Sequence, residues 1–390
     1  MYKVRTYNKI SVKGLDRFSR QAYEVGSDIA HPDAFLLRSQ KLQGIEVPAS
    51  LLAVARAGAG VNNVPVTEYG KRGIVVFNTP GANANAVKEL VMAGMLLSAR
   101  GVVDGMNFVQ SLGDLKDPAE MSARLEKEKS RFAGTEIRGK TLGIVGLGAI
   151  GSMVADMALA MGMQVIGFDP VLSIDAAWRL SNEVGRMENL QSLLARSDYV
   201  SLHVPALDAT RHMINDDTLA VIKTGAVLLN FARDAIVDPA AILRSLAGGR
   251  LGRYVCDFPE PALLGHPQII AMPHIGASTE ESEENCAVMA ANQLIDYLEN
   301  GNIVNSVNFP RIGMERSPGT SRITFANENV SGVLGDVLSI LADNQVNVVD
   351  MMNKSRGELA FNIVDVERTP SDQVIDAIQA VAHVIRVRVI

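Results

Sequence analysis

The chain has 390 residues, 47% of them hydrophobic and 21% charged, which is the composition of an ordinary soluble globular protein with two or three domains. Its formal net charge of −6 argues against a nucleic-acid-binding surface, because such a surface needs clustered positive charge. It contains no run of about 18 apolar residues, so no membrane span is expected.

Cysteine and histidine usage narrows the class further. The two cysteines, Cys256 and Cys286, lie in neither a C-x-x-C nor a metal-ligand spacing, and no two of the six histidines form an H-x-x-x-H pair. We therefore expect no metal site and a reduced, cytoplasmic compartment. The N-terminal residues are too polar for a signal peptide, so none is expected.

The N-terminal part of the chain alternates strand-like runs with polar or helical ones, which predicts a parallel α/β domain. Arg38 and Arg56 each follow one of these runs, and ligands of open α/β sheets bind past the carboxyl ends of strands. The two arginines either form a basic pocket for an anion or are ordinary surface residues, and this stretch alone leaves both open. Strands are expected at 4–7, 35–37, 52–55 and 74–77.

A turn at 78–81 precedes a long apolar helix that we expect over 82–101. Because this helix is more apolar than a surface helix needs to be, we expect it between domains or subunits. The next stretch, 104–136, is more polar and contains a helical segment at 121–129. We expect it to leave the domain body as an arm.

A glycine fingerprint organises the middle of the chain. A short apolar run ends at Gly146, and Gly148 and Gly151 follow before an apolar helical segment, which gives G-x-G-x-x-G in a strand–turn–helix context. These glycines permit a tight turn, a close approach of a pyrophosphate and close helix packing, and the helix N-terminus favours phosphate. Asp169 ends the next predicted strand, where its carboxylate can accept ribose hydroxyls, which favours NAD over NADP. The alternative is a glycine-rich turn beside a solvated aspartate.

Six strands with crossovers are typical of a complete dinucleotide-binding domain. Among the helices between them, one at 239–247 should begin with Pro239 and be capped by Asp238. A further helix over 278–300 is expected to return the chain to the first domain. The six strands are expected at 142–146, 164–168, 199–204, 226–231, 253–257 and 268–272.

The C-terminal residues form a separate pattern. A charged, turn-rich linker at 311–319 is followed over 320–390 by elements in the order βαββαβ. A unit of this size is marginal as an independent core. It would gain stability by pairing its sheet with a copy from another subunit.

Three polar residues follow strand-like segments in the second half of the chain, namely Arg233, Glu260 and His274. Because the carboxyl ends of parallel strands meet at one edge of a sheet, these side chains can converge on one cleft. Taken singly, each has an ordinary structural explanation.

These features resemble the D-2-hydroxyacid dehydrogenase family and, within it, the phosphoglycerate dehydrogenases with a C-terminal ACT domain. The resemblance covers nearly the whole chain. It implies two doubly wound α/β domains with parallel sheets, Rossmann-like or flavodoxin-like, and a ferredoxin-like βαββαβ ACT domain. The motifs that carry it are Asn78-Thr-Pro-Gly, the fingerprint at Gly146, the stretch from Asn230 to Asp238, Phe258-Pro-Glu-Pro and Pro273-His-Ile-Gly-Ala-Ser-Thr.

The resemblance also implies a domain organisation. A discontinuous substrate-binding domain comprises 1–81 and 279–310, and an NAD-binding Rossmann domain spans 82–278. The ACT-like regulatory domain occupies 320–390. We expect a homodimer or homotetramer.

The family mechanism implies roles for the three polar residues. His274 acts as general base on the substrate's 2-hydroxyl, and Glu260 stabilises the protonated imidazole. Arg233 binds the substrate carboxylate and the developing carbonyl oxygen. The substrate-binding residues implied by the resemblance are Arg38, Arg56, Asn83 and Arg233. The cofactor-binding residues implied by it are Gly146, Gly148, Ala149, Ile150, Gly151, Asp169, Val204, Phe231, Asp257, His274, Gly276 and Ala277.

The chain departs from the family at two places near these residues. Asp234-Ala235 follows Arg233 where Gly-Gly is common, so a side chain and a carboxylate lie close to the catalytic arginine. The segment 257–260 is two residues shorter than the common form, which makes the reach of Glu260 toward His274 an open question.

In serine-regulated members of the family, an amino acid binds between paired ACT sheets. The matching positions here are Asn327, Asn329 and Asn347. Asn327 stands where histidine is common, and Ser331 where proline is usual. The domain is therefore either a serine sensor or an assembly element.

The resemblance implies NAD-dependent oxidation of 3-phospho-D-glycerate to 3-phosphohydroxypyruvate, the first step of serine biosynthesis, with serine as a possible effector. One alternative is another 2-hydroxyacid dehydrogenase, such as a hydroxypyruvate reductase. A second alternative is a non-catalytic protein that senses NAD.

Overall fold

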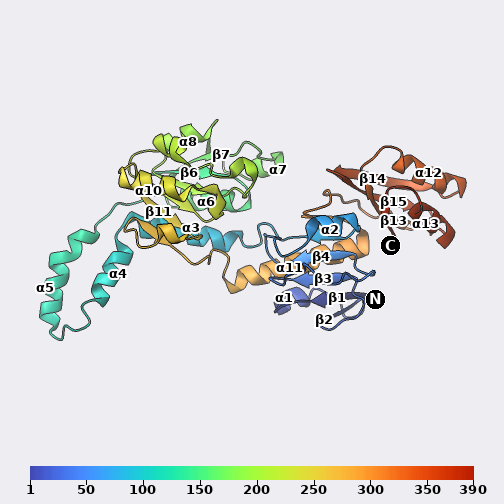
Figure 1. The fold of residues 1–390 in the computed structure, drawn as a ribbon, viewed down its shortest axis with the longest axis horizontal. Coiled ribbons are helices and arrows are strands. Elements are labelled where there is room, and N and C mark those ends of the chain that lie inside the picture. Colours follow the sequence, from blue (N-terminus) through green and yellow to red (C-terminus); the bar gives the residue numbers. More distant parts are fainter. The chain divides into compact units, whose positions relative to one another are not determined.

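The computed structural model describes residues 1–390, apart from the side chain of Asp175. The chain divides into two compact units (Figure 1). Unit 1 comprises residues 1–83 and 279–390, and unit 2 comprises residues 84–278. No helix among the described residues is both long enough and apolar enough to cross a membrane.

The first sheet of unit 1 has five parallel strands in the order β2-β1-β3-β4-β5, the flavodoxin-like order that the family resemblance implies. Its central strand β3 is buried along its whole length, as expected for a parallel strand covered on both faces. The short strand β2 at the sheet edge was not predicted. The strands are β1 (Tyr2–Thr6), β2 (Tyr23–Gly26), β3 (Ala34–Leu37), β4 (Ala53–Arg56) and β5 (Val75–Phe77).

Three helices of unit 1 accompany this sheet, namely α1 (Val12–Leu15), α2 (Val66–Lys71) and the long α11 (Glu280–Asn300). Thr279 caps α11 by accepting the backbone N–H of Ser282 at 3.1 Å, and Gly301 ends it with a φ of +72°. Helix α11 packs on β3 and β4 and against α1. It thereby closes the hydrophobic core of this domain.

Unit 2 is a doubly wound sheet of seven parallel strands in the order β12-β11-β10-β9-β6-β7-β8. Helices cover both faces, α3 and α6 on one and α8, α9 and α10 on the other, so two hydrophobic cores flank the sheet. The predicted Rossmann-like architecture is confirmed, and only the two-residue edge strand β8 was not predicted. The strands are β6 (Thr141–Val145), β7 (Gln164–Phe168), β8 (Gly185–Arg186), β9 (Tyr199–Leu202), β10 (Ala226–Asn230), β11 (Leu251–Cys256) and β12 (Ile269–Ala271).

Helix α10 begins where the sequence predicts its cap. Asp238 accepts the backbone N–H groups of Ala240 and Ala241, and Pro239 is the first residue of α10. The α-helices of this unit are α3 (Ala84–Ala99), α4 (Val102–Gln110), α5 (Pro118–Glu128), α6 (Ala149–Ala160), α7 (Ile174–Ala177), α8 (Leu190–Arg196), α9 (Asp216–Ala220) and α10 (Pro239–Ala247). The 3₁₀ turns are η1 (Lys129–Phe132), η2 (Asp208–Thr210), η3 (Asp234–Ile236) and η4 (Pro261–Leu263).

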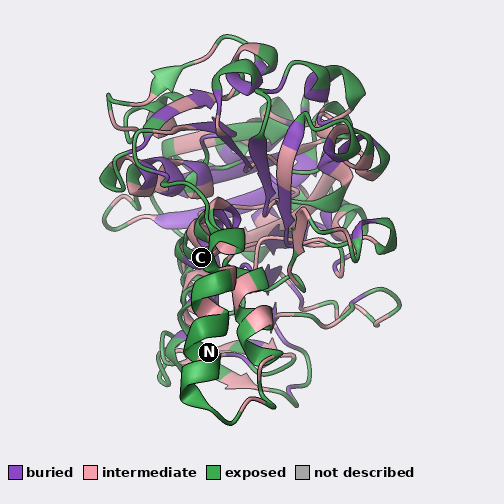
Figure 2. Ribbon diagram, turned by 90° about the vertical axis from the view of Figure 1, so that its left-hand side faces the viewer, coloured by how far each residue is buried: buried purple, intermediate pink, exposed green. Residues whose placement is uncertain are grey.

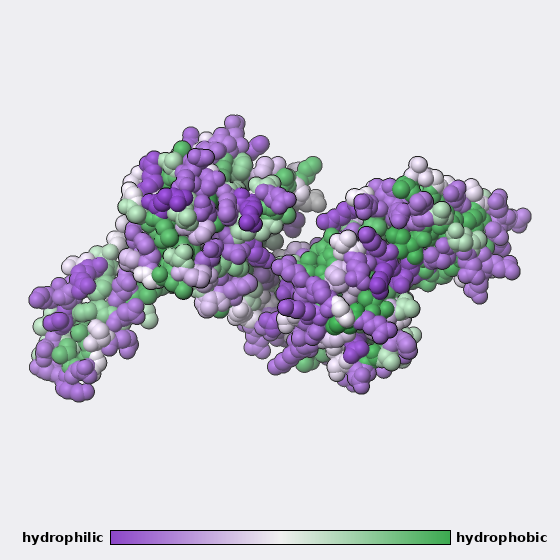
Figure 3. Space-filling model, viewed as in Figure 1, coloured by the Kyte–Doolittle hydropathy of each residue, from purple (hydrophilic) through white to green (hydrophobic). Residues whose placement is uncertain are grey.

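Helices α4 and α5 leave the body of unit 2 as an arm, in agreement with the sequence analysis (Figure 1). Neither helix has a buried residue, and the arm facing the viewer in Figure 2 is coloured exposed and intermediate. Apolar side chains nevertheless lie at its surface, as Figure 3 shows. The arm therefore adds surface to the domain without adding to its core.

The C-terminal part of unit 1 is a four-stranded antiparallel sheet in the order β14-β15-β13-β16. One face packs on α12 and α13, and the other contributes Phe361 and Ile363 to the core that contains Tyr297 and Phe309. The βαββαβ unit is thus packed on its own chain. Its elements are β13 (Ser321–Glu328), α12 (Val333–Asp343), β14 (Val348–Arg356), β15 (Leu359–Val366), α13 (Asp372–Gln379) and β16 (Val384–Val389).

Strand β13 is eight residues long and continues to Glu328. It pairs with β15 as far as Glu328 and with β16 as far as Asn327. Hydrogen bonding on both edges keeps these residues extended, and this pairing depends on strands distant in sequence.

Candidate active site

The three glycines of the fingerprint occupy sites that differ in what surrounds them. Gly146 has a φ of +91°, and a Cβ there would lie 2.7 Å from the carbonyl oxygen of His203. A Cβ on Gly151 would collide with the carbonyl oxygen of Gly146, so this glycine allows α6 to pack against the turn. A Cβ on Gly148 would meet no atom within 4 Å, which leaves open space at the start of α6.

The N-terminus of α6 suits an anion. No side chain caps the helix, and its first turn carries no acidic residue. Ala149 and Ile150 form this first turn, so their backbone N–H groups lie at the positive end of the helix dipole. The uncapped helix and the open space at Gly148 fit the diphosphate of a dinucleotide.

Asp169 follows β7 and fixes the glycine loop. Its Oδ2 accepts the backbone N–H of Leu147 at 2.9 Å, and its Oδ1 accepts that of Val171 at 3.0 Å. The residue is only partly buried, so its carboxylate can accept further hydrogen bonds. This position fits the ribose-binding role that the sequence predicts. Among the described residues, no group of three or more His, Cys, Asp or Glu side chains could hold a metal ion.

Two more of the expected cofactor residues follow strands of the same sheet. Val204 lies two residues beyond β9, and Phe231 is buried directly after β10. A Cβ on Gly94 of α3 would lie 2.9 Å from the Phe231 ring, so the helix passes close to this residue. Beside Val204, burial lowers the pKa of His203 to about 3, which keeps its imidazole neutral.

Arg233 is exposed, and its loop is held by Asn230, the last residue of β10. The buried Asn230 amide donates to the carbonyl oxygen of Arg233 at 2.8 Å and accepts the N–H of Ala232 at 3.2 Å. Asp234 and Ala235 enter a 3₁₀ turn, and neither has a positive φ. The turn therefore does not require the glycines that are common in the family.

His274 is exposed in the loop after β12 and has a φ of +56°, which is uncommon for a residue other than glycine. The next two backbone N–H groups, those of Ile275 and Gly276, donate to the Asp257 carboxylate at 2.8 and 2.7 Å. Asp257 is 1% exposed. Ala277, also expected at the cofactor, ends the same turn.

Phe258 joins the arginine and the histidine. Its ring centroid lies 4.4 Å from that of His274, and the guanidinium carbon of Arg233 lies 5.7 Å from the centroid of the Phe258 ring. Arg233 and His274 are therefore brought to one aromatic side chain from the ends of β10 and β12.

Glu260 does not join this group by a hydrogen bond. Among the described residues, no hydrogen bond or ion pair connects it to His274. It lines a small pocket with Asp234, Tyr254, Leu263 and Phe258, whose ring contacts His274. Two local features favour this placement: the segment from Asp257 is short, and the Glu260 carbonyl accepts the N–H of Leu263 at 2.9 Å, which fixes the residue at the start of η4.

The two arginines of unit 1 lie together at the ends of two neighbouring strands, with Arg38 directly after β3 and Arg56 as the last residue of β4. The Nε of Arg56 donates to the carbonyl oxygen of Arg38 at 3.0 Å. Gly58 has a φ of +147°, and a Cβ there would collide with the Arg56 guanidinium, so the small residue allows this close approach. A guanidinium nitrogen of Arg38 lies 2.5 Å from a carboxylate oxygen of Glu283 on α11. Asn83, the third expected residue, is half-buried at the end of the first segment of unit 1.

The three asparagines of the C-terminal domain occupy different places. Asn327 is buried, and its Oδ1 accepts from Asn362 at 2.8 Å, while exposed Asn329 donates to the carbonyl oxygen of Gly357 at 3.1 Å. Asn347 is exposed just before β14, at the opposite end of the sheet from Asn327. Seven residues of strand separate its level from that of Asn327, which is roughly 23 Å at about 3.3 Å per residue. One protomer therefore does not bring the three together.

Sequence reasoning missed the parts of the site that act through other residues. Asn230 and Phe258 belong to the sequence motifs, but the motifs indicate no role for them. The resemblance places Asp257 only at the cofactor. A polar residue at the end of a buried strand was the available signal for Asn230 and Asp257. For Phe258 no local signal existed, because its partners come from two other loops.

The chain matches two family models. The model of the D-isomer specific 2-hydroxyacid dehydrogenase, NAD binding domain, matches residues 95–276. The model of the ACT domain matches residues 321–383.

Curated relatives and solved structures agree with these matches. The D-3-phosphoglycerate dehydrogenase of Haemophilus influenzae is 33% identical over 357 residues, which cover 89% of this chain and 83% of the relative. That of Escherichia coli K12 is 32% identical over 360 residues, with the same two coverages. The TT0316 protein of Thermus thermophilus has a TM-score of 0.60 at 29% identity and covers 78% of this chain and 99% of its own. The NAD⁺-bound 3-phosphoglycerate dehydrogenase of Entamoeba histolytica, at 24% identity, has a TM-score of 0.61 and covers 79% and 98%.

Proposed function

This chain belongs to the D-isomer-specific 2-hydroxyacid dehydrogenase family, and we propose that it oxidises 3-phospho-D-glycerate to 3-phosphohydroxypyruvate with NAD. The substrate assignment rests on Arg38 and Arg56, which meet at the ends of two neighbouring strands of unit 1, where the Nε of Arg56 donates to the backbone carbonyl oxygen of Arg38. Two guanidinium groups beside a small-residue loop suit a phosphate dianion, whereas an unphosphorylated 2-hydroxy acid has no use for them.

NAD is the cofactor of this family, and its binding domain here is unit 2. The open space at Gly148 and the N-terminus of α6 would hold the diphosphate, and the Asp169 carboxylate would hold the ribose. When bound, NAD supplies the acceptor for the hydride that leaves carbon 2 of the substrate.

We assign the proton transfer to His274. An exposed imidazole in the loop after β12 can accept the proton of the substrate's 2-hydroxyl. Arg233 would bind the substrate carboxylate and stabilise the charge that develops on the carbonyl oxygen. Glu260 could act as the carboxylate partner of the imidazole only after its side chain rotated out of the pocket that it lines with Asp234.

A steady-state assay with a panel of 2-hydroxy acids tests this function. NADH formation should be fastest with 3-phosphoglycerate. A higher kcat/KM for glycerate, for hydroxypyruvate in the reverse direction, or for lactate would instead indicate another 2-hydroxyacid dehydrogenase. Binding of NAD without turnover of any panel member would indicate a non-catalytic sensor of NAD.

Replacement of Arg56 by Ala tests the phosphate site. The KM for 3-phosphoglycerate should rise at least about tenfold, because a charged hydrogen bond to phosphate contributes about 1.5–3 kcal/mol. The KM for glycerate should stay within about twofold. Arg72→Ala is a matched control, because Arg72 pairs with Glu68 on α2 of the same unit.

We propose, secondly, that the C-terminal domain binds serine. Asn327 and Asn329 lie at one end of its sheet and Asn347 at the other, so the three residues could contact one ligand only if two copies of the domain contributed. Calorimetric titration with serine should give heat that Asn329→Ala reduces. The absence of both heat and inhibition would leave the domain with an assembly role only.

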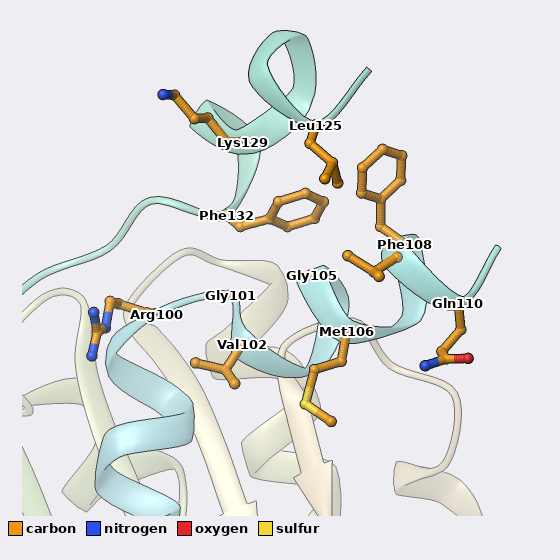
Figure 4. A pocket seen from close by; sticks show the side chains of 11 residues that line it. Arg100, Gly101, Val102, Gly105, Met106, Phe108, Gln110, Leu125, Lys129 and Phe132 are labelled. Carbon is orange, nitrogen blue, oxygen red and sulfur yellow. The ribbon is translucent and has the colours of Figure 1, made fainter. Parts of the chain in front are cut away.

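We also propose that copies of the chain associate through the arm that α4 and α5 form. Phe108, Leu125 and Phe132 point toward one another around a cavity of about 610 Å³, while Lys129 points away from it (Figure 4). Met106 on the same arm is 64% exposed. We expect a homodimer or homotetramer in sedimentation velocity. The variant Met106→Glu should dissociate it, whereas Val171→Glu, at an exposed site of the same unit, should not.

We propose, finally, that the protein is located in the cytoplasm. Both cysteines are free thiols and buried. Two reduced cysteines in an enzyme of this family favour the cytoplasm. Fractionation of cells that express a tagged chain would test this.

A further inference from the structure

The end of β11 and the loop after β12 are neighbours because the two strands pair in parallel, with Cys256 beside Ala271. The backbone N–H of Met272 donates to the carbonyl oxygen of Cys256 at 2.8 Å, which extends the pairing past the strand ends. Asp257, the next residue, therefore lies alongside the loop that carries His274. Its side chain is almost entirely shielded from solvent.

The backbone of His274 is in a costly conformation. A left-handed φ of +56° is uncommon in a residue other than glycine, so surrounding contacts must hold it. The two N–H groups that follow His274 point to one carboxylate, with Oδ1 and Oδ2 of Asp257 accepting one each. Among the described residues, these two N–H groups have no other hydrogen-bond partner.

We propose that Asp257 is the positioning residue of His274: its carboxylate fixes the turn Ile275-Gly276 and thereby the direction of the imidazole. This inference rests on the proposed function, in which His274 is the base. The Asp257 carboxylate orients the imidazole indirectly, by holding the backbone N–H groups of the two residues that follow His274. Glu260, which has no hydrogen bond to the ring, does not supply that support.

A direct contact of Asp257 with the cofactor is the competing explanation. The burial of the side chain argues against it, because 1% exposure leaves little surface for a ligand. A Cβ on Gly276 would lie 2.9 Å from Oδ2 of Asp257, so the loop backbone covers the carboxylate closely.

The substitution Asp257→Asn separates the two explanations. It keeps the size of the side chain but replaces one acceptor oxygen by an N–H donor, so one of the two loop N–H groups loses its partner. Asp238→Asn is the matched control in the same unit. It removes the same charge, but a single oxygen of Asp238 accepts both N–H groups there, and asparagine caps helices as well as aspartate does.

The first readout is amide hydrogen exchange in NAD-free protein. In Asp257→Asn, a peptide that spans 272–279 should exchange about tenfold faster, as expected when a hydrogen bond worth about 1.4 kcal/mol is lost. Peptides that span 141–151 should not change, nor should 272–279 in Asp238→Asn. Unchanged exchange of 272–279 in Asp257→Asn would overturn the inference, whatever the enzyme's substrate proves to be.

The second readout is a double-mutant cycle with His274→Ala. Asp257→Asn should lower kcat by about 100-fold, the cost of a displaced catalytic group, and should change the NAD dissociation constant by less than about threefold. In the His274→Ala background the same substitution should change kcat by less than about threefold, because the group that it positions is gone.

The outcomes of the cycle are distinct. Effects that multiply, or a loss of NAD affinity as large as the loss of kcat, would overturn the inference and favour a cofactor contact. A His274→Ala variant with full activity would contradict the proposed function of His274, and the exchange readout would still decide whether Asp257 fixes the loop. If His274→Ala has no measurable rate, the amide exchange of 272–279 and the NAD dissociation constant, both measured in Asp257→Asn, decide between the two explanations.

Discussion

The rings of Phe258 and His274 lie 4.4 Å apart from centroid to centroid, at an interplanar angle of 46°. The Arg233 guanidinium stands 5.7 Å from the centroid of the same phenyl ring. One aromatic side chain therefore packs against both groups that we assign to the chemistry, and it limits the directions that each can take.

Replacing Phe258 by Leu should lower kcat about 3–10-fold, because an aromatic pair contributes about 0.5–1.5 kcal/mol beyond its buried area. Phe258→Tyr keeps the ring and should retain activity within about twofold. Steady-state kinetics with saturating NAD measures both. Wild-type activity in Phe258→Leu would show that the ring contact does not orient His274.

The substitution Glu283→Gln should lower the KM for 3-phosphoglycerate about 2–5-fold. Glu283 pairs with Arg38 at 2.5 Å, and both side chains are partly exposed, so removing its charge leaves the guanidinium for phosphate at small cost. Glu284→Gln is the control. Glu284 is the next residue in the chain and carries the same charge, but its carboxylate pairs with Lys13 at 2.6 Å and not with Arg38. An equal change in both variants would mean that overall charge, and not Arg38, sets the affinity.

Two alanine substitutions in the glycine loop should have opposite consequences. In Gly148→Ala the new Cβ meets no protein atom within 4 Å, so the free energy of unfolding should stay within about 0.5 kcal/mol while NAD affinity falls at least about tenfold. In Gly151→Ala the Cβ collides with backbone, and stability should fall by about 1–3 kcal/mol. Denaturant unfolding and NAD titration distinguish them. Full NAD affinity in Gly148→Ala would mean that the diphosphate does not bind at this site.

Acidification should destabilise unit 2 through His203. Burial lowers its pKa to about 3 in the folded protein, against about 6.5 when unfolded. Above pH 6.5 the residue is neutral in both states. As the pH falls below 6.5 only the unfolded chain binds the proton, so the free energy of unfolding falls by up to about 1.4 kcal/mol per pH unit until pH 3.

The variant His203→Asn isolates this contribution. Between pH 7.5 and pH 5.0 it should lose about 2 kcal/mol less stability than the wild type, measured from urea unfolding at both pH values. Equal losses in the two proteins would mean that His203 titrates normally in the folded state.

Local sequence determined the elements and the cofactor loop. Periodicity and turn residues predicted the strands of both parallel sheets apart from two short edge strands, and Asp238-Pro239 predicted the start of α10 to the residue. The G-x-G-x-x-G spacing predicted a tight turn, and Gly146 takes a positive φ there. These features follow from residues close together in the chain, because helix caps and tight turns are satisfied by their immediate neighbours.

Contacts between side chains on different strands were decided only by the tertiary structure. The pairing of β11 with β12 puts Asp257 next to the histidine loop, whereas Glu260 lines a pocket with Asp234 and Phe258. The partnership of Glu260 with His274, which the motif order favours, stays a prediction. Strand register likewise separates Asn347 from Asn327 within one copy of the chain. Register depends on which distant strands pair and at what offset, and a sequence motif contains no direct record of either.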